Sequence, residues 1–556
     1  MSFAIDILRP FAWRWRKELA IAGAFFVVLV SPFLLRPGDS TSPYRYNRRL
    51  VIMTPHPDQI REEFGRAFAR YWKETKGETL SIDWRVAGTS DLNTLIKSDF
   101  RSAFQHYWSG SLAQPNAGEA AATFLNPKAA PGSQPRAEFL KSNVGIGVDL
   151  FFGGGPHDFQ SQAAAGTLVA ADVKTGCGLA AIRTRHPEWF GDHGIPEIVS
   201  GQAFRDKDMR WCGTCLSSFG IVFNRDVMQR LGITKDPATW EDLTDPRLLG
   251  QVALADPSKS GSATQAFEMI VQQQMQLAVA RFKARPGHLR KPADIEAAGV
   301  REGWLEGLRL IQSISGNARY FADASPKTPL DVSRGDAAAG MCIDFYGRSG
   351  EEAVRRPDGT SRIGFVAPLG GTTLTVDPIG LMRGAPEPQL AESFMEFVLS
   401  ERGQKLWDFR VGTPGGPGRT PLRRLPIRKD FYTEANLKQM SDAGEEPFLK
   451  AQSFIYHPEW TSGLFDSLRF IIRIICVDTH DELQETWTML AQQHNPPRAS
   501  EIFHQLALVD YDAARGDINR ILTSKDKVLQ VREARRLTDA FRHQYRQALT
   551  FARAEK

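Results

Sequence analysis

The stretch VALADPSKSGSATQAFEMI, residues 252–270, reads as an apolar strand, a polar loop and then an amphipathic helix. The first turn of a helix has backbone N–H groups without partners and lies at the positive end of the helix dipole. It therefore suits an anion or a polar ligand. The alternative is that Ser260 or Ser262 only caps its own helix. Taken alone, the stretch favours the cap, and the rest of the chain has to decide.

The same plan of strand, loop and helix recurs along the chain of 556 residues. It is found at RRLVIMTPHPDQIREEFGRAFARYWKETKG (48–77), LSIDWRVAGTSDLNTLIKSDF (80–100) and VGIGVDLFFGGGPHDFQSQAAAGTLVAA (144–171). Short strands that alternate with helices predict an α/β fold with mainly parallel sheets. Residues 109–137 are rich in Ala, Gly, Pro and Ser, which predicts a flexible insertion. Residues 471–556 predict a charged, mostly helical C-terminal extension.

The polar loops fall at the C-terminal ends of the predicted strands, where open α/β sheets bind their ligands. Four such loops contain glycines or hydroxyl groups, and IDFYGR (343–348) supplies a fifth strand end. One loop of this kind is ordinary. Five of them favour a ligand that is held by backbone N–H groups and hydroxyls over simple helix capping.

The N-terminus combines a basic flank with an apolar run. Four basic residues between Arg9 and Lys17 precede Leu19–Leu35, which contains no charged residue. As a helix this run spans about 25 Å, slightly less than the roughly 30 Å of a bilayer core. The pattern predicts either a short membrane anchor or a cleaved signal sequence, with the rest of the chain on the extracytoplasmic side. No small-residue cleavage site follows Leu35, which favours the anchor.

Composition and motifs exclude several classes of function. The net charge is +5, and Lys and Arg are spread along the chain, so nucleic-acid binding has little support. The chain contains no nucleophile elbow, P-loop, HExxH or dinucleotide fingerprint, which disfavours an enzyme. Cys212 and Cys215 form a CGTC pair that leads into a strand. A local disulfide or plain packing is therefore favoured over redox chemistry.

Taken together, the ordered motifs resemble those of the exported solute-binding proteins of ABC importers, of the type II branch that binds iron or sugar phosphates. They cover residues 49–428 in the order of that family. The motifs are VIMTPHPDQIREEFGRAF, WRVAGTSDL, VDLFFGGGPHDFQSQAAAGTLVA, SSFGIVFNRDVMQRLGI, TWEDLTDPRLLGQVALADPSKSGSA, GDAAAGMCIDFYGR and DPIGLMRGAPEPQLAESFMEFVLSERGQKLW.

The resemblance implies a two-lobed periplasmic-binding-protein-like fold with two crossover strands, near 219–224 and 373–381, and a ligand in the cleft between the lobes. It implies no catalytic residue, metal ligand or cofactor. The domains expected on this basis are a membrane segment (1–36), a linker (37–48), lobe 1 (49–218 and 376–470), lobe 2 (219–375) and the helical extension (471–556). A cap without a ligand role is the favoured function of that extension, and docking of a partner or covering of the cleft is the alternative.

The resemblance also implies which residues contact the ligand. Arg348 is a candidate to pair with an anionic group in a bidentate way, and a surface ion pair is the favoured alternative for this residue. The expected ligand-binding residues of lobe 1 are Thr54, Pro55, His56, Thr89, Ser90, Gly154 and Gly155. Those of lobe 2 are Ser260, Gly261, Ser262, Asp344, Phe345, Tyr346 and Arg348.

The expected solute is small and polar. Ferric-ion members of the family use paired tyrosines, and this chain has no adjacent pair, so iron ranks below an organic or phosphorylated solute. Serine- and glycine-rich helix starts suit phosphate or carboxylate. The resemblance therefore implies a protein that captures a solute and delivers it to an ABC permease. The alternatives are a ferric-ion-binding protein of the same fold or a membrane-anchored solute sensor that works with a partner chain.

Overall fold

The computed structural model describes residues 25–26, 46–129, 132–285, 287, 289, 291–524 and 526–554. The chain divides into two units, residues 1–49 with 69–81, and residues 50–68 with 82–556. In the first unit Asn47 N donates to Thr79 O at 2.9 Å, and Thr79 N donates back to Asn47 Oδ1 at 3.1 Å. The cavities described below all belong to the second unit.

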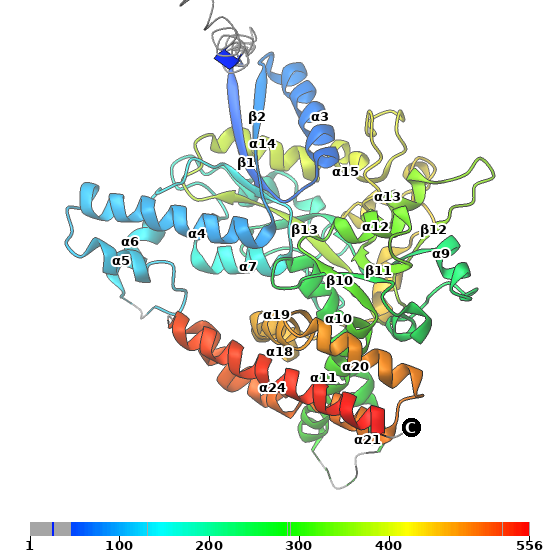
Figure 1. The fold of residues 1–556 in the computed structure, drawn as a ribbon. Coiled ribbons are helices and arrows are strands. Elements are labelled where there is room, and N and C mark those ends of the chain that lie inside the picture. The colour runs from blue at the N-terminus through cyan, green and yellow to red at the C-terminus, as the bar shows by residue number, and fades with distance from the viewer. Residues whose placement is uncertain are drawn as a thin grey trace, which may run out of the picture. The chain divides into compact units, whose positions relative to one another are not determined.

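Two sheets form the framework of the second unit (Figure 1). In both, the fourth strand in the order, β13 or β8, is the one that follows a crossing between the sheets. The first sheet has the order β2 (Leu80–Val86), β1 (Arg48–Thr54), β3 (Leu150–Phe152), β13 (Thr375–Met382) and β4 (Leu168–Val169), and β7 (Cys212–Ser217) pairs with β13. The second has the order β10 (Ala318–Ala322), β9 (Val252–Ala255), β11 (Ala339–Ile343), β8 (Phe219–Asn224) and β12 (Ile363–Val366). Strands β1 and β3 are parallel, as are β9, β10 and β11, whereas β13 and β8 run antiparallel to their neighbours. The predicted α/β class is confirmed.

The chain crosses between the two sheets twice. Strand β7 ends at Ser217 and β8 begins at Phe219, so Ser218 alone separates strands of different sheets. The chain returns through residues 367–374, between β12 and β13. The two crossings meet where Thr375 of β13 pairs with Ser217 of β7. Strands therefore lie at both positions where the sequence predicts the crossovers.

Helices follow the strands as the alternating pattern predicts. Those before the first crossing are α3 (Asp58–Lys76), α4 (Thr89–His106), α5 (Ala117–Thr123), α6 (Gln134–Lys141), α7 (Pro156–Ala165) and α8 (Leu179–Arg185). Those between the crossings are α9 (Arg225–Arg230), α10 (Gly261–Ala284), α11 (Pro292–Gly316), α12 (Lys327–Arg334) and α13 (Asp344–Ala353). After the return come α14 (Pro388–Leu399) and α15 (Glu401–Asp408).

Helices α10 and α11 pack closely because three glycines of α11 face the α10 backbone. Gly299, Gly303 and Gly307 are spaced four residues apart, which places them on one face of the helix. A Cβ atom at Gly303 would lie 2.2 Å from the Met275 Cα, far inside any normal contact. The three glycines therefore form a flat face, the glycine face, which sets the distance between the two helices.

The segment expected to be a flexible insertion is instead folded, which corrects the sequence prediction. Its described residues form α5 and α6, and they pack against α4 through aromatic rings. The rings of Phe104 and Phe124 stack at 4.3 Å, and Phe139 meets Phe124 edge-on at 4.6 Å. Buried aromatic side chains contribute enough apolar contact to order a segment whose composition otherwise suggests a loop.

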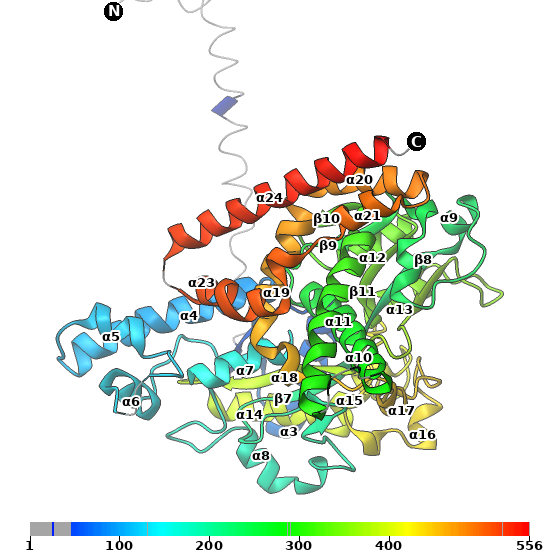
Figure 2. The ribbon, with the colours of Figure 1, turned by 90° about the horizontal axis from the view of Figure 1, so that it is seen from below.

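The C-terminal helices pack on α10 and α11 and share one hydrophobic core with the second sheet. They are α18 (Pro458–Thr461), α19 (Phe465–Ile472), α20 (His480–Gln492), α21 (Pro497–Phe503), α22 (Tyr511–Ala513), α23 (Asn519–Thr523) and α24 (Lys527–Ala554). Figure 2 shows α24 lying along α20 and α21. Buried hydrogen bonds fix this packing: Trp304 Nε1 donates to Val509 O at 2.9 Å, and Trp487 Nε1 donates to Asn317 Oδ1 at 2.8 Å.

A histidine in this core makes stability depend on pH. Burial lowers the pKa of His504 to about 4, and the Arg309 charge acts in the same direction. Its Nδ1–H donates to Gln312 Oε1 at 2.9 Å. Below about pH 6.5, His504 takes up a proton in the unfolded chain but not in the folded chain. The folded state therefore loses stability relative to the unfolded state as the pH falls toward 4.

We expect the free energy of unfolding at pH 4.5 to include a loss of about 2 kcal/mol from this histidine relative to pH 7. A His504→Gln variant cannot take up the proton, so its unfolding free energy should change less over this interval. Urea unfolding of both proteins at the two pH values measures the difference. Equal losses in the two proteins would contradict the assignment.

The cysteine pair and the N-terminus complete the comparison with the sequence. Cys212 and Cys215 are free thiols buried in β7, and burial raises the pKa of both to about 12, which fits plain packing. Apart from Phe25 and Phe26, the predicted membrane segment lies outside the described residues. Within the described part of the chain, no helix is both long and apolar enough to span a bilayer.

Candidate functional site

A cavity of about 20 Å³, the central cavity, lies where the loops of both sheets meet the crossing strands. Its walls come from the loops that follow β2, β3 and β9, and from β7 and β13. Its lining residues include Thr89, Gly154, Gly155, Asp158, Gly261, Ser262, Gln265, Asp377 and Phe465. Both sheets thus contribute to one hollow, although its volume holds little more than a water molecule.

A larger cavity of about 180 Å³, the outer cavity, adjoins the central one. The two share His157, Gln265 and Phe465 as lining residues. The outer cavity is bounded by α7, by the hairpin of β5 (Ile198–Val199) and β6 (Gln202–Ala203), by α10 and by a segment of the C-terminal part of the chain. Its polar lining comes from His157, Gln160, Gln202, Gln265, Glu268 and Tyr456.

Residues 456–469, which we call the strap, form one wall of both cavities. Tyr456 N donates to Ser200 O in the β5–β6 hairpin at 2.8 Å, and the Phe465 ring stacks on His157 of α7 with centroids 4.4 Å apart. Figures 1 and 2 show α18 and α19 between α7 and α10. The strap therefore touches elements on both sides of the crossings.

The strap is also bonded to α10. Gln272 Nε2 donates to His457 O and to Thr461 Oγ1, both at 2.8 Å. The sequence analysis assigned these strap residues to lobe 1 and favoured a role without ligand contact for the extension that follows. The structure places the strap against α10 and in the cavity walls.

Glu268 is the one carboxylate among the residues that line the outer cavity. Its side chain is only 3% exposed, and burial raises its pKa. Tyr456 OH and Thr461 Oγ1 both donate to Glu268 Oε1, at 2.8 and 2.6 Å. A buried carboxylate is therefore held in a fixed orientation at the wall of a hollow.

The helix starts near the central cavity already carry polar side chains of the chain itself: Ser260 caps α10, and α7 and α13 each have an aspartate in the first turn. Ser260 Oγ accepts from Ala263 N at 3.2 Å, so the capping explanation holds for Ser260, while Gly261 and Ser262 line the cavity. Asp158 lies in the first turn of α7, and Asp344 Oδ1 accepts from Phe345 N at 2.8 Å at the start of α13. A carboxylate in the first turn already satisfies the helix dipole, so these helix starts are poor sites for a second anion.

Asp377 lies at the back of the central cavity in a buried ion pair. Arg424 Nη1 is 2.5 Å and His56 Nε2 is 3.2 Å from Asp377 Oδ2. Burial alone would raise the pKa of Asp377, but the Arg424 charge and the His56 contact outweigh it and lower the pKa. Burial lowers the pKa of His56, so the imidazole is neutral at pH 7. The pair joins strand β13 to residues that follow α15.

Five of the fourteen residues expected to contact a ligand line the central cavity: Thr89, Gly154, Gly155, Gly261 and Ser262. Two more, Asp344 and Arg348, line a separate cavity of about 60 Å³, which Ser218 also lines. His56 is buried against the Phe152 and Trp407 rings, and Thr54 is fully buried and accepts from His56 N. Neither of these two lines a cavity described here. Pro55 and Ser90 are half-buried next to these loops, and Ser260 acts as the helix cap.

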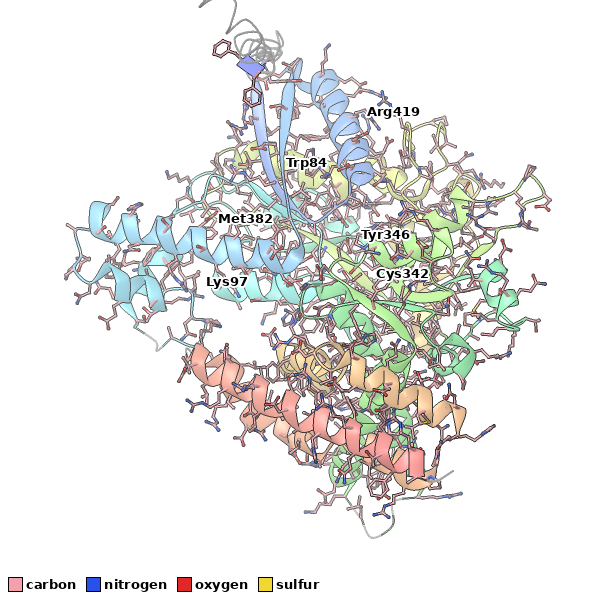
Figure 3. The ribbon with its side chains drawn as sticks, in the orientation of Figure 1. Trp84, Lys97, Cys342, Tyr346, Met382 and Arg419 are labelled. Atoms are coloured by element: carbon pink, nitrogen blue, oxygen red, sulfur yellow. The ribbon has the colours of Figure 1, made fainter. Side chains whose placement is uncertain are left out.

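The IDFYGR motif differs from its expected form. Strand β11 ends at Ile343 and α13 begins at Asp344, whose carboxylate lies in the first turn and accepts from Phe345 N. The motif is thus a strand end followed at once by a helix. Phe345 is buried beneath the Arg424 guanidinium at 3.9 Å, and Tyr346 packs on Phe345 at 4.0 Å. Figure 3 shows Tyr346 close to Cys342, where the strand passes into the helix.

Several residues that line the cavities were not predicted from the sequence: Asp158, Gln202, Gln265, Glu268, Tyr456 and Phe465. Gln265 and Glu268 are three residues apart in the helix that begins at Gly261, so they share a face with its first turn. The spacing of these two residues therefore indicates, from the sequence alone, that they lie near the loop at the start of this helix. Nothing in the sequence near Tyr456 or Phe465 indicates that the chain returns to this place. Among the described residues, no group of three or more His, Cys, Asp or Glu is arranged to hold a metal ion.

Comparisons with known proteins support the predicted relationship. Residues 190–417 match the family described as bacterial extracellular solute-binding protein. An uncharacterized protein of Haemophilus influenzae is 25% identical over 259 residues, which is 47% of this chain and 60% of that protein. The putrescine/cadaverine-binding protein of Pseudomonas aeruginosa is 26% identical over 231 residues, 40% of this chain and 58% of that protein.

The chain thus spans about three fifths of the length of these relatives. Among solved structures, the periplasmic binding protein AfuA of Actinobacillus pleuropneumoniae with fructose-6-phosphate is similar at a TM-score of 0.41 and 18% identity, over 65% of this chain and 81% of that one. The match to the extracellular solute-binding family agrees with the prediction made from the ordered motifs.

Proposed function

We propose that this chain, related to the bacterial extracellular solute-binding proteins through residues 190–417, captures a small polar solute between its two sheets and delivers it to an ABC importer. The observation that carries the proposal is the pair of adjoining cavities lined from both sheets. A solute there touches α7 on one side and α10 on the other. Contacts made to both sides only in the closed arrangement would stabilise closure.

The location and partner follow from the same proposal. The family description is extracellular, and the basic flank before Leu19–Leu35 is typical of a segment that directs export or anchors a chain in the membrane. We propose that the lobes lie on the extracytoplasmic side and that the N-terminal segment holds them near a permease.

A screen by thermal shift on the full chain tests solute capture. It includes sugar phosphates, carboxylates, amino acids, Fe(III), and the putrescine and cadaverine named for the Pseudomonas relative. A solute that binds only the folded state raises the melting temperature by mass action, by an amount that grows with concentration. Isothermal titration then gives the Kd of each hit.

A matched pair of variants locates the binding. Ser262→Tyr introduces a ring that is larger than the central cavity and would extend into the adjoining outer cavity, so it should weaken binding of the hit at least tenfold. Ser102→Tyr, on the exposed face of α4, should leave the affinity unchanged. If no compound binds, or if Ser262→Tyr binds as well as the wild type, the proposal fails.

A further inference from the structure

The charge and size of the outer cavity indicate which class of solute it takes. The strap forms one of its walls, and Glu268 of α10 is hydrogen-bonded to the strap at that wall. We propose, resting on solute capture as the function, that the cavity binds the ammonium group of a small aliphatic amine with Glu268 as its counter-ion. This differs from the phosphate or carboxylate expected from the sequence.

The hydrogen bonds of Glu268 leave an acceptor for the solute. Tyr456 OH and Thr461 Oγ1 both donate to Oε1 and so hold the carboxylate in place. No donor among the described residues is bonded to Oε2. Hydrogen bonds that join two charged groups are about twice as strong as those between neutral groups, so an ammonium is the preferred donor for this atom.

Two amide side chains at the cavities have polar atoms that can form a hydrogen bond with a solute. Gln202 is 5% exposed and lines the outer cavity, and its Nε2 has no hydrogen-bond partner among the described residues. Gln265 donates from Nε2 to Thr375 Oγ1 at 3.4 Å, which leaves its oxygen as an acceptor. Because an amide presents either its oxygen or its nitrogen after a half-turn, Gln202 can also accept from a solute. Buried polar groups are normally paired, so their lack of partners points to a polar solute.

The charges around both cavities disfavour an anion. Glu268 and Asp158 are carboxylates near the shared wall, and Arg469 is the arginine that acts on Asp158. Asp377 is balanced by Arg424. With the carboxylates ionised and histidine neutral, three carboxylates and two guanidinium groups give a net charge of −1 among these residues. Burial raises the pKa of Glu268 and of Asp158, and an ammonium group beside Glu268 would favour its charged form. A phosphate or carboxylate would add a like charge in a partly desolvated place, whereas an ammonium would neutralise it.

Size and aromatic lining narrow the class further. A cavity of about 150 Å³ holds one benzene molecule, so the outer cavity, of about 180 Å³, fits a solute of about six or seven non-hydrogen atoms. That is the size of a four- or five-carbon diamine. The rings of Tyr456 and Phe465 line the same cavity, and aromatic faces attract ammonium groups.

The test compares compounds of equal length on the full chain at pH 7.5, by thermal shift and isothermal titration. The probes are 1,4-diaminobutane, 1-aminobutane, butane-1,4-diol, succinate and inorganic phosphate. We expect both amines to bind, and the diol, succinate and phosphate to bind at least a hundredfold more weakly or not at all.

Three variants test the role of Glu268. Glu268→Gln keeps an oxygen for Tyr456 and Thr461 but removes the charge, and it should weaken amine binding at least thirtyfold. Tyr456→Phe removes one of the bonds that orient the carboxylate and should weaken binding about fivefold. Glu302→Gln, at an exposed position of α11, is the control and should bind as the wild type does.

The outcomes separate this inference from the proposed function. If succinate or phosphate binds and is excluded by Ser262→Tyr while amines do not bind, the chain captures solutes but the amine inference is wrong. If amines bind equally well to wild type and to a folded Glu268→Gln protein, the assignment of Glu268 is wrong. If none of these probes and none of the compounds of the wider screen binds, both proposals fail.

Discussion

Replacing Gly303 by alanine should lower the free energy of unfolding by about 3 kcal/mol or prevent folding altogether. The added Cβ would lie 2.2 Å from Met275 Cα and 2.5 Å from Met275 N, both backbone atoms that no side-chain rotation can move. The helices α10 and α11 would have to separate along their shared core, which also contains Trp304 and Leu308. Chemical unfolding followed by circular dichroism measures the loss.

Gly118 supplies the matched control for this substitution. It lies inside α5, and a Cβ there would meet nothing within 4 Å. Because alanine has the higher helix propensity, Gly118→Ala should stabilise the protein by about 0.5–1 kcal/mol. If Gly303→Ala were as stable as Gly118→Ala, close packing at the glycine face would not be what holds the two helices together.

Replacing Arg424 by methionine should lower the free energy of unfolding by about 3–5 kcal/mol, because it leaves the Asp377 carboxylate buried without its guanidinium partner. Arg424 is 2% exposed and also covers the Phe345 ring at 3.9 Å. His56 remains at 3.2 Å, but as a neutral imidazole it does not replace the lost charge.

A second substitution distinguishes charge from packing in this result. In the Arg424→Met background, Asp377→Asn removes the unpaired charge and should restore about half of the lost stability. Urea unfolding of the wild type, the two single variants and the double variant forms the cycle. If the double variant were as unstable as the sum of the single ones, the two side chains would not act as a pair.

Local patterns predicted much of the framework. The strand–loop–helix units are encoded within about 25 residues each, so periodicity and loop composition reveal them. Thr89, Gly154 and Gly261 were expected to lie near one another, since each follows the carboxyl end of a strand and such ends gather at one edge of a sheet. The structure brings all three to the central cavity.

Two local expectations were wrong for identifiable reasons. IDFYGR was expected as a strand end, but only Ile343 belongs to the strand, and a helix begins at Asp344, whose carboxylate accepts from Phe345 N in the first turn. The composition of residues 109–137 suggested a flexible insertion, whereas the stacked rings of Phe104 and Phe124 order the segment. In both cases specific side-chain contacts outweigh the average tendency of the surrounding sequence.

The outer cavity could not be predicted because its walls come from distant parts of the chain. Glu268 and Thr461 are 193 positions apart, and Ser200 bonds to a strap residue more than 250 positions later. No single-sequence pattern links such positions. The glycines at 299, 303 and 307 are different, because their spacing of four was visible in the sequence and indicates close helix packing.

The single residue between β7 and β8 limits how the protein can open. Only the backbone torsions of Ser218 and its immediate neighbours lie between two strands that are each locked into a different sheet. Residues 367–374, which connect β12 to β13, form a longer connection that can bend more easily. Within it, Gly371 O accepts a hydrogen bond from Trp240 Nε1 at 2.7 Å. The two halves are therefore expected to swing about a pivot at Ser218, with the longer path bending to follow. Stiffening that path, for example by proline substitutions, should slow the exchange between open and closed forms more than it changes either end state.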